Sequence, residues 1–136
     1  MQRIVLLGFL VLLATLGATP PCNGTGLSIT SVAVKNVSSS GNLNTYHISG
    51  TVTNTGSQAE PNSALQSVDI FMAQEKLDAK SIPPLAAGQS YTFDYAYQRS
   101  NDAGNGTTHL RFSIDLHQAG ADAGCRLARG TYELTF

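Results

Sequence analysis

Hydrophobic and polar residues alternate along most of the chain beyond residue 26, and this period of two is typical of β-strands. The candidate strands cover residues 27–37, 45–53, 66–73, 77–82, 90–98, 108–117 and 131–136. Clusters of Gly, Pro, Asn and Ser, which favour turns, separate them. About seven short strands with this spacing predict an all-β fold, an immunoglobulin-like antiparallel β-sandwich.

The alternation also divides the side chains of each strand between a buried face and a solvent face. Sheets that bury one face in this way pack together as a sandwich. The predicted core residues are Tyr46, Ile48, Gly50, Val52, Val68, Ile70, Met72, Leu110, Phe112, Ile114, Leu116, Tyr132, Leu134 and Phe136. The solvent-facing residues of two of these strands are predicted to be Ser67, Asp69 and Phe71 in one, and His109, Arg111, Ser113, Asp115 and His117 in the other.

An aromatic residue occupies every second position from Tyr91 to Tyr97. The intervening positions are mostly polar, so we expect the aromatic side chains to belong to the core, with tyrosine hydroxyls at its margin. The alternative is that Tyr91, Tyr95 and Tyr97 are exposed and stack on sugar rings. Their solvent exposure distinguishes the two interpretations.

The amino terminus has one basic residue, Arg3, then an apolar run to about residue 18, then small residues. This order is typical of a secretory signal peptide, and the run is shorter than the roughly 20 residues that span a bilayer. We therefore predict a signal peptide at 1–18, a short lead at 19–26 and a sandwich domain at 27–136. The protein is expected to be secreted and extracellular, with no membrane span after signal removal.

Two cysteines, Cys22 and Cys125, lie at opposite ends of the predicted mature chain. In an oxidising compartment they suggest one disulfide, and two free thiols are the alternative. They lack the spacing of a metal site, so no metal is predicted. Asn23, Asn36 and Asn105 begin Asn-x-Ser/Thr sequons and are candidates for N-glycosylation.

Charge is low and balanced along the chain. The 136 residues include 8 Lys and Arg against 9 Asp and Glu, a formal net charge of -1, and charged residues make up only 12%. A basic surface for a phosphate backbone is therefore missing, and nucleic acid is not an expected partner.

Two groups of residues test whether the chain could be an enzyme. Ser113, Asp115 and His117 share one strand face, but Ser113 and His117 would lie about 13 Å apart at about 3.3 Å per residue, too far for a catalytic hydrogen bond. Asp69 and Asp115 could form a carboxylate pair if their strands pair, but a flat sheet face offers no cleft. We predict no catalytic residue and no cofactor, and a hydrolase is only a remote alternative.

Three segments of the chain are ISGTVTNTGSQAEPN, SVDIFMAQEKLDAKSIPPLAAGQSYTFDY and LRFSIDL. Together they resemble the CARDB family, the cell adhesion related domain found in bacteria, over roughly residues 27–118. The matching features are a strand that ends in Asn54-Thr55-Gly56, a Val-Asp-Ile-Phe strand, the Leu-Ala-Ala-Gly-Gln-Ser bend and the Phe-Ser-Ile-Asp strand. The resemblance implies an immunoglobulin-like β-sandwich.

The leading functional hypothesis is a secreted, non-catalytic interaction or adhesion module that binds an extracellular protein or a cell-wall polymer. Its candidate binding residues are Asp69, Phe71, Arg111, Ser113 and Asp115, because an apolar ring beside an arginine is typical of protein-contact centres. The loops at the ends of the sandwich are the competing binding surface. The alternative is a carbohydrate-binding module with a polysaccharide ligand held by the tyrosines.

Overall fold

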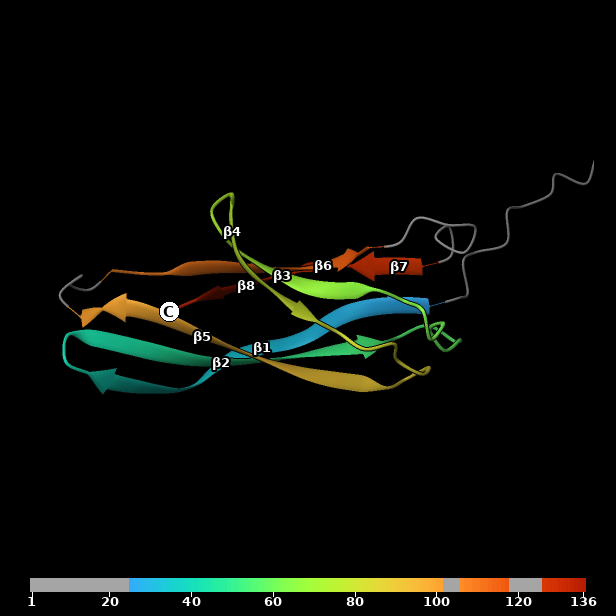
Figure 1. Cartoon of the computed structure of the whole chain (residues 1–136), viewed down its shortest axis with the longest axis horizontal. Coiled ribbons are helices and arrows are strands. Elements are labelled where there is room, and N and C mark those ends of the chain that lie inside the picture. Colours follow the sequence, from blue (N-terminus) through green and yellow to red (C-terminus); the bar gives the residue numbers. More distant parts are fainter. Residues whose placement is uncertain (1–24, 102–105, 118–125) are drawn as a thin grey trace, which may run out of the picture.

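The computed structural model of the chain describes residues 25–101, 106–117 and 126–136, and these form two packed β-sheets (Figure 1). Sheet A contains, in spatial order, β5 (Ser90–Ser100), β2 (Leu43–Asn54), β1 (Thr25–Ser40) and β7 (Arg126–Arg129). Sheet B contains β4 (Glu75–Ser81), β3 (Gln66–Met72), β6 (His109–Leu116) and β8 (Thr131–Thr135). The predicted all-β sandwich is confirmed.

Neighbouring strands are antiparallel except for β1 and β7, which pair in parallel. The strand β7 was missed in the sequence because its four residues are too few to show alternation. Gly130 follows it with a φ of 78°, a left-handed conformation that a residue with a Cβ rarely adopts. This residue turns the chain from sheet A into sheet B, where β8 begins.

The core lies between the sheets and is apolar. It consists of Leu27, Val32, Ile48, Val52, Val68, Ile70, Ile82, Leu85, Phe93, Leu110, Phe112 and Ile114. Phe93 of sheet A packs on Phe112 of sheet B with ring centroids 5.9 Å apart. Gly50 makes room for this contact, because a Cβ there would overlap the Phe93 ring. The predicted core face of β2 is thereby confirmed for Ile48, Gly50 and Val52, whereas Tyr46 is half-buried outside the core cluster.

Two predictions about individual residues in β3 need correction. Met72 was expected in the core, but it ends the strand and is 37% exposed. Ser67 and Asp69 were expected to face solvent, yet they are only 4% and 5% exposed. They do lie on the outer face of the sheet, so alternation predicted their direction correctly, and neighbouring side chains cover them.

The end of the sandwich where β2 finishes is organised by Asn54, a fully buried side chain. Its Oδ1 accepts hydrogen bonds from the backbone N–H groups of Gly26 and Gly56, and its Nδ2 donates to the carbonyls of Gln58 and Leu85. The amide therefore joins the start of β1, the loop after β2 and the bend before β5. That bend turns at Gly88, whose φ is 76°.

Five of the predicted features lie outside the described residues: the signal peptide at 1–18, Cys22, Asn23, Asn105 and Cys125. The remaining sequon asparagine, Asn36, is exposed on β1. Within the described residues, no helix is long and apolar enough to cross a lipid bilayer.

Candidate binding face on sheet B

The five predicted binding residues come together on the outer face of two paired strands, β3 and β6. The register places Phe71 opposite Arg111 and Asp69 opposite Ser113. Asp115 lies opposite Ser67, one step further along the same face. Side chains at every second position of two neighbouring strands form a continuous surface. We call the surface formed by Asp69, Phe71, Arg111, Ser113 and Asp115 the β3–β6 face.

At one end of the β3–β6 face, an arginine covers an aromatic ring. The guanidinium carbon of Arg111 lies 4.7 Å from the ring centroid of Phe71, within the range of a cation–π contact. Phe71 is half-buried and Arg111 is exposed. A hollow of about 410 Å³, lined in part by Arg111, His109 and Glu133, lies beside the pair.

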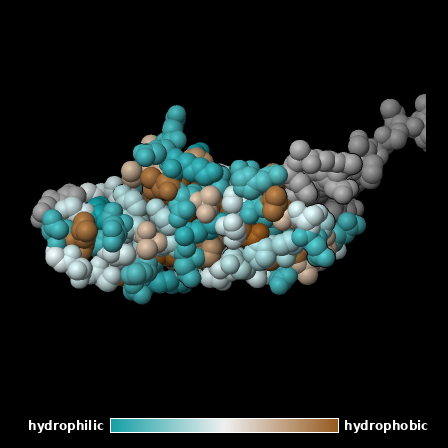
Figure 2. All heavy atoms as spheres, in the orientation of Figure 1, coloured by the Kyte–Doolittle hydropathy of each residue, from teal (hydrophilic) through white to brown (hydrophobic). Residues whose placement is uncertain are grey.

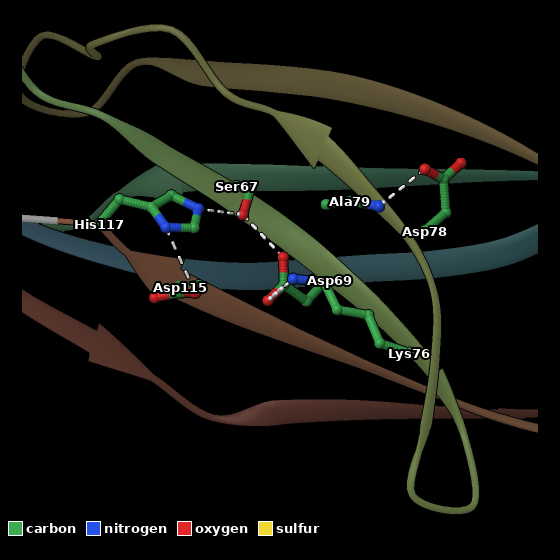
Figure 3. A network of polar contacts seen from close by, with 7 residues as sticks. All are labelled: Ser67, Asp69, Lys76, Asp78, Ala79, Asp115 and His117. Carbon is green, nitrogen blue, oxygen red and sulfur yellow. Dashed lines mark hydrogen bonds and ion pairs between the residues drawn. The ribbon is translucent and has the colours of Figure 1, made fainter.

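At the other end, five side chains form a connected series of polar contacts that runs from Asp115 to Lys76 (Figure 3). His117 Nδ1 lies 3.4 Å from Asp115 Oδ2, and His117 Nε2 lies 2.8 Å from Ser67 Oγ. Ser67 donates to Asp69 Oδ1 at 2.7 Å, and Lys76 Nζ lies 3.0 Å from Asp69 Oδ2. We call these five residues the Asp115–Lys76 network.

The network explains why Asp69 can be buried on an outer sheet face. A buried carboxylate needs hydrogen bonds and an opposite charge, and Ser67 and Lys76 provide them. Lys76 reaches Asp69 from β4, the neighbouring strand, and keeps its own amino group half in solvent. The negative charge of Asp69 is therefore neutralised by Lys76.

Asp115, His117 and Ser67 stand in the order of a Ser/His/Asp triad, although the sequence suggested Ser113 as the serine. The hydrogen positions oppose catalysis. Because Ser67 gives its hydrogen to Asp69, its oxygen can only accept one from His117, whereas a nucleophilic serine must pass its hydrogen to the imidazole. Ser67 is also buried. The arrangement supports a structural role.

Asp69, Asp115 and His117 are also the group in the described residues that could hold a cation. One ligand atom from each lies within 4.8 Å of the others. A cation would compete with Lys76, which already neutralises Asp69. The sequence suggested Asp69 and Asp115 as a pair if their strands pair, but it did not add His117, because the pairing of β3 with β6 brings Asp69 to residues more than forty positions later in the chain.

The tyrosines of the alternative carbohydrate site do not form an exposed platform. Tyr95 and Tyr97 are half-buried and pack against the hydrophobic core, while Tyr91 is 38% exposed. Phe93, between them, is buried. Stacking on a sugar requires aromatic faces open to solvent, so this geometry favours the expectation that the aromatic face of β5 belongs to the core.

Two groups where β4 meets β5 have shifted pKa values. The backbone N–H of Ala79, which donates to Asp78, lowers the pKa of that carboxyl below its ordinary 3.8; burial opposes this, and Lys80 adds to it. Burial raises the pKa of Tyr95 above its ordinary 10.0, and the charges of Asp78 and Tyr97 raise it further. Both groups lie away from the β3–β6 face.

Leu65, just before β3, was not singled out from the sequence. It is 66% exposed, and its carbonyl accepts a hydrogen bond from the backbone N–H of His117. A hollow of about 410 Å³ lined by Leu65, Ser67 and His117 therefore borders the network. An isolated apolar residue in a polar segment gives no periodic signal, so only the structure places it beside the site.

A family model for CARDB matches residues 25–120. No curated protein matches the chain. CARDB is an adhesion-related, non-enzymatic domain family. Because the match spans more than half of the 136 residues and the fold is the sandwich that the family implies, the chain belongs to the CARDB family.

Proposed function

We propose that the chain is a non-catalytic, extracellular interaction module that binds a protein partner through the β3–β6 face. The observation that carries the proposal is the Phe71–Arg111 pair, in which a guanidinium lies on an aromatic ring at 4.7 Å on the outer side of a sheet. Arginine and aromatic residues dominate binding energy at protein interfaces. On a surface with few charges, this pair is a distinctive contact centre.

The surroundings of the pair suit a protein partner. The hollow beside Arg111 can take an apolar side chain, and a partner there would remove both the ring and the guanidinium from water. Most of the surface seen in Figure 2 is hydrophilic or neutral, and its hydrophobic spots are scattered. A small apolar centre with a polar rim is typical of a non-obligate interface.

The Asp115–Lys76 network supplies the polar rim. Asp115, Lys76 and His117 remain exposed at their outer edges, while Asp69 and Ser67 hold them in place. Charged groups at a rim select partners and orient them more than they add affinity. Asp115 and Lys76, of opposite sign, would favour a partner whose own charges are arranged in the complementary order.

Membership in an adhesion-related family and the predicted signal peptide support an extracellular location. A cell-wall polymer is a less suitable ligand, because the tyrosines pack against the core and the β3–β6 face exposes one partly covered ring.

The test is a comparison of variants in binding to extracellular proteins and to a glycan array. The purified chain and its Phe71→Ala and Arg111→Ala variants are passed over extracellular proteins, and each captured partner is identified and titrated. We expect one protein partner whose affinity falls about thirtyfold or more in either variant, as for a contact-centre residue. Ser31→Ala, at an exposed position of β1 in sheet A, is the control and should bind normally.

Three results would overturn the proposal. One is binding to glycans and to no protein. Another is a protein partner that all three variants bind equally. The third is binding to neither class by the correctly folded chain.

A further inference from the structure

Of the four edge strands in the two sheets, β5 is the one without the features that normally protect an edge. The edges β7 and β8 have only four and five residues. The edge β4 carries Lys76 and Lys80, and its pairing with β3 is interrupted by a bulge. By contrast, β5 has eleven residues, contains no lysine, proline or glycine, and pairs with β2 without interruption.

The free backbone groups of β5 belong to the even-numbered residues from Thr92 to Gln98. At one end of the β2–β5 ladder the N–H of Asn54 bonds to the carbonyl of Gln89, and at the other the N–H of Asn101 bonds to the carbonyl of Asn42. Residues of an antiparallel strand bond alternately to one side and the other. Odd-numbered residues therefore bond to β2, and residues such as Thr92 and Ala96 direct their N–H and C=O away from it.

Nothing in the described part of the chain pairs with that outer side. A hollow of about 610 Å³ lies against the middle of β5. It is lined by Asp94, Tyr95 and Ala96, by Lys80 of β4, and by residues of β1 and β2 such as Lys35 and His47. An extended backbone running beside β5 would satisfy its free groups, so the edge fits a strand.

The sequence of β5 favours a second copy of β5 as the pairing strand, because it is nearly symmetric about Tyr95. In an antiparallel pair of two copies centred on this residue, three of the five kinds of opposed pair match in character, one sets a tyrosine against an arginine, one sets an aspartate against an alanine, and no like charges are directly opposed. The opposed pairs would be Ser90 with Ser100, Tyr91 with Arg99, Thr92 with Gln98, Phe93 with Tyr97, Asp94 with Ala96, and Tyr95 with itself.

We propose that two copies of this chain associate through β5, edge to edge and antiparallel about Tyr95, and join their A sheets into one continuous sheet. The contact is two-fold symmetric, so each free N–H and C=O of one copy has a counterpart in the other. It leaves the β3–β6 face of both copies open and does not depend on the function proposed for that face.

The first test measures self-association of the chain, expressed from its whole coding sequence, by sedimentation velocity over a range of concentrations. We expect a dimer that dissociates on dilution. Ala96→Pro removes an N–H that points away from β2, a position where an edge strand accepts proline, so the fold should survive. The dimer dissociation constant should rise about tenfold or more. Ala96→Ser keeps the N–H and should dimerise like the parent.

The second test addresses the register. Lysines at both position 92 and position 98 (Thr92→Lys with Gln98→Lys) would face each other across the two-fold axis, so this double variant should be monomeric. Thr92→Glu with Gln98→Lys opposes unlike charges and should dimerise. A chain that is monomeric throughout the range, or a dimer insensitive to Ala96→Pro and to both charge pairs, overturns the proposal.

Discussion

The hydroxyl of Ser67 lies 2.8 Å from Nε2 of His117, fifty positions later in the chain, and donates its hydrogen to Asp69. This one oxygen connects the end of β6 to the buried carboxylate of β3.

We expect Ser67→Ala to lower the free energy of unfolding by about 1 to 3 kcal/mol, because buried Asp69 loses a hydrogen bond that nothing replaces. Denaturant titration followed by circular dichroism measures the loss. Ser113→Ala is the control, since Ser113 is the cross-strand neighbour of Asp69 and makes no side-chain hydrogen bond within the described residues. Equal stability of the parent and the Ser67 variant would show that the network contributes nothing.

Gly50 is expected to tolerate no side chain. Gly50→Ala places a methyl group against the ring of Phe93, and the overlap should destabilise the fold by about 1 to 3 kcal/mol or more. Thermal unfolding of Gly50→Ala, of Phe93→Leu and of the double variant tests the cause. If the ring is responsible, the double variant loses less than the sum of the two single changes. An additive result would place the cost elsewhere, and Ser49→Ala controls for the strand itself.

Asn54 should be among the least replaceable polar residues. Asn54→Ala removes the partner of two backbone N–H groups and of the Gln58 carbonyl, and leaves the Leu85 carbonyl with the Glu60 N–H alone, so we expect a loss of about 3 kcal/mol in the free energy of unfolding. Asn54→Asp should be worse at neutral pH than in acid, because a carboxylate would face the carbonyls of Gln58 and Leu85. Asn62→Ala, at an exposed loop position, is the control, and a mild effect at Asn54 would contradict the prediction.

Asp78 should contribute to stability only above the acid range. Its pKa is lowered in the folded chain by the Ala79 N–H, so the ionised form is favoured by folding and its contribution is lost as pH falls through the folded pKa. The free energy of unfolding is measured against pH from neutral to well below 3.8, the ordinary pKa. Asp78→Asn keeps an acceptor for the N–H but cannot ionise, so its profile should fall less in acid. Parallel profiles for parent and variant would contradict this assignment.

Much of the fold follows from local pattern, and the exceptions have physical causes. Alternation placed Val68, Ile70 and Phe112 in the core because a strand packed on one face must bury every second side chain. It predicted correctly that the side chain of Asp69 points outward, but wrongly that this side chain is exposed to solvent. Burial also depends on the side chains that neighbouring strands place over it. Met72 was wrongly assigned to the core because alternation does not show where packing ends.

In the candidate site too, the sequence predicted the direction of single side chains, and the structure decided which of them are in contact. Phe71 and Arg111 were both predicted to face outward, and their contact depends on the register of β3 with β6. His117 was rejected as a partner of Ser113 by the spacing along one strand. The structure pairs it with Ser67 instead, because a side chain just past a strand end can reach the neighbouring strand.

By itself, the sequence determined the class of fold, the position of most strands, the inward and outward direction of their side chains, and the resemblance to CARDB. These follow from steric rules that act between residues close in the chain. The tertiary structure alone decided which outward residues meet, that Ser67 and Asp69 are covered, and that β5 is left as an open edge. Those outcomes depend on register and strand order, which are set by packing between segments far apart in sequence.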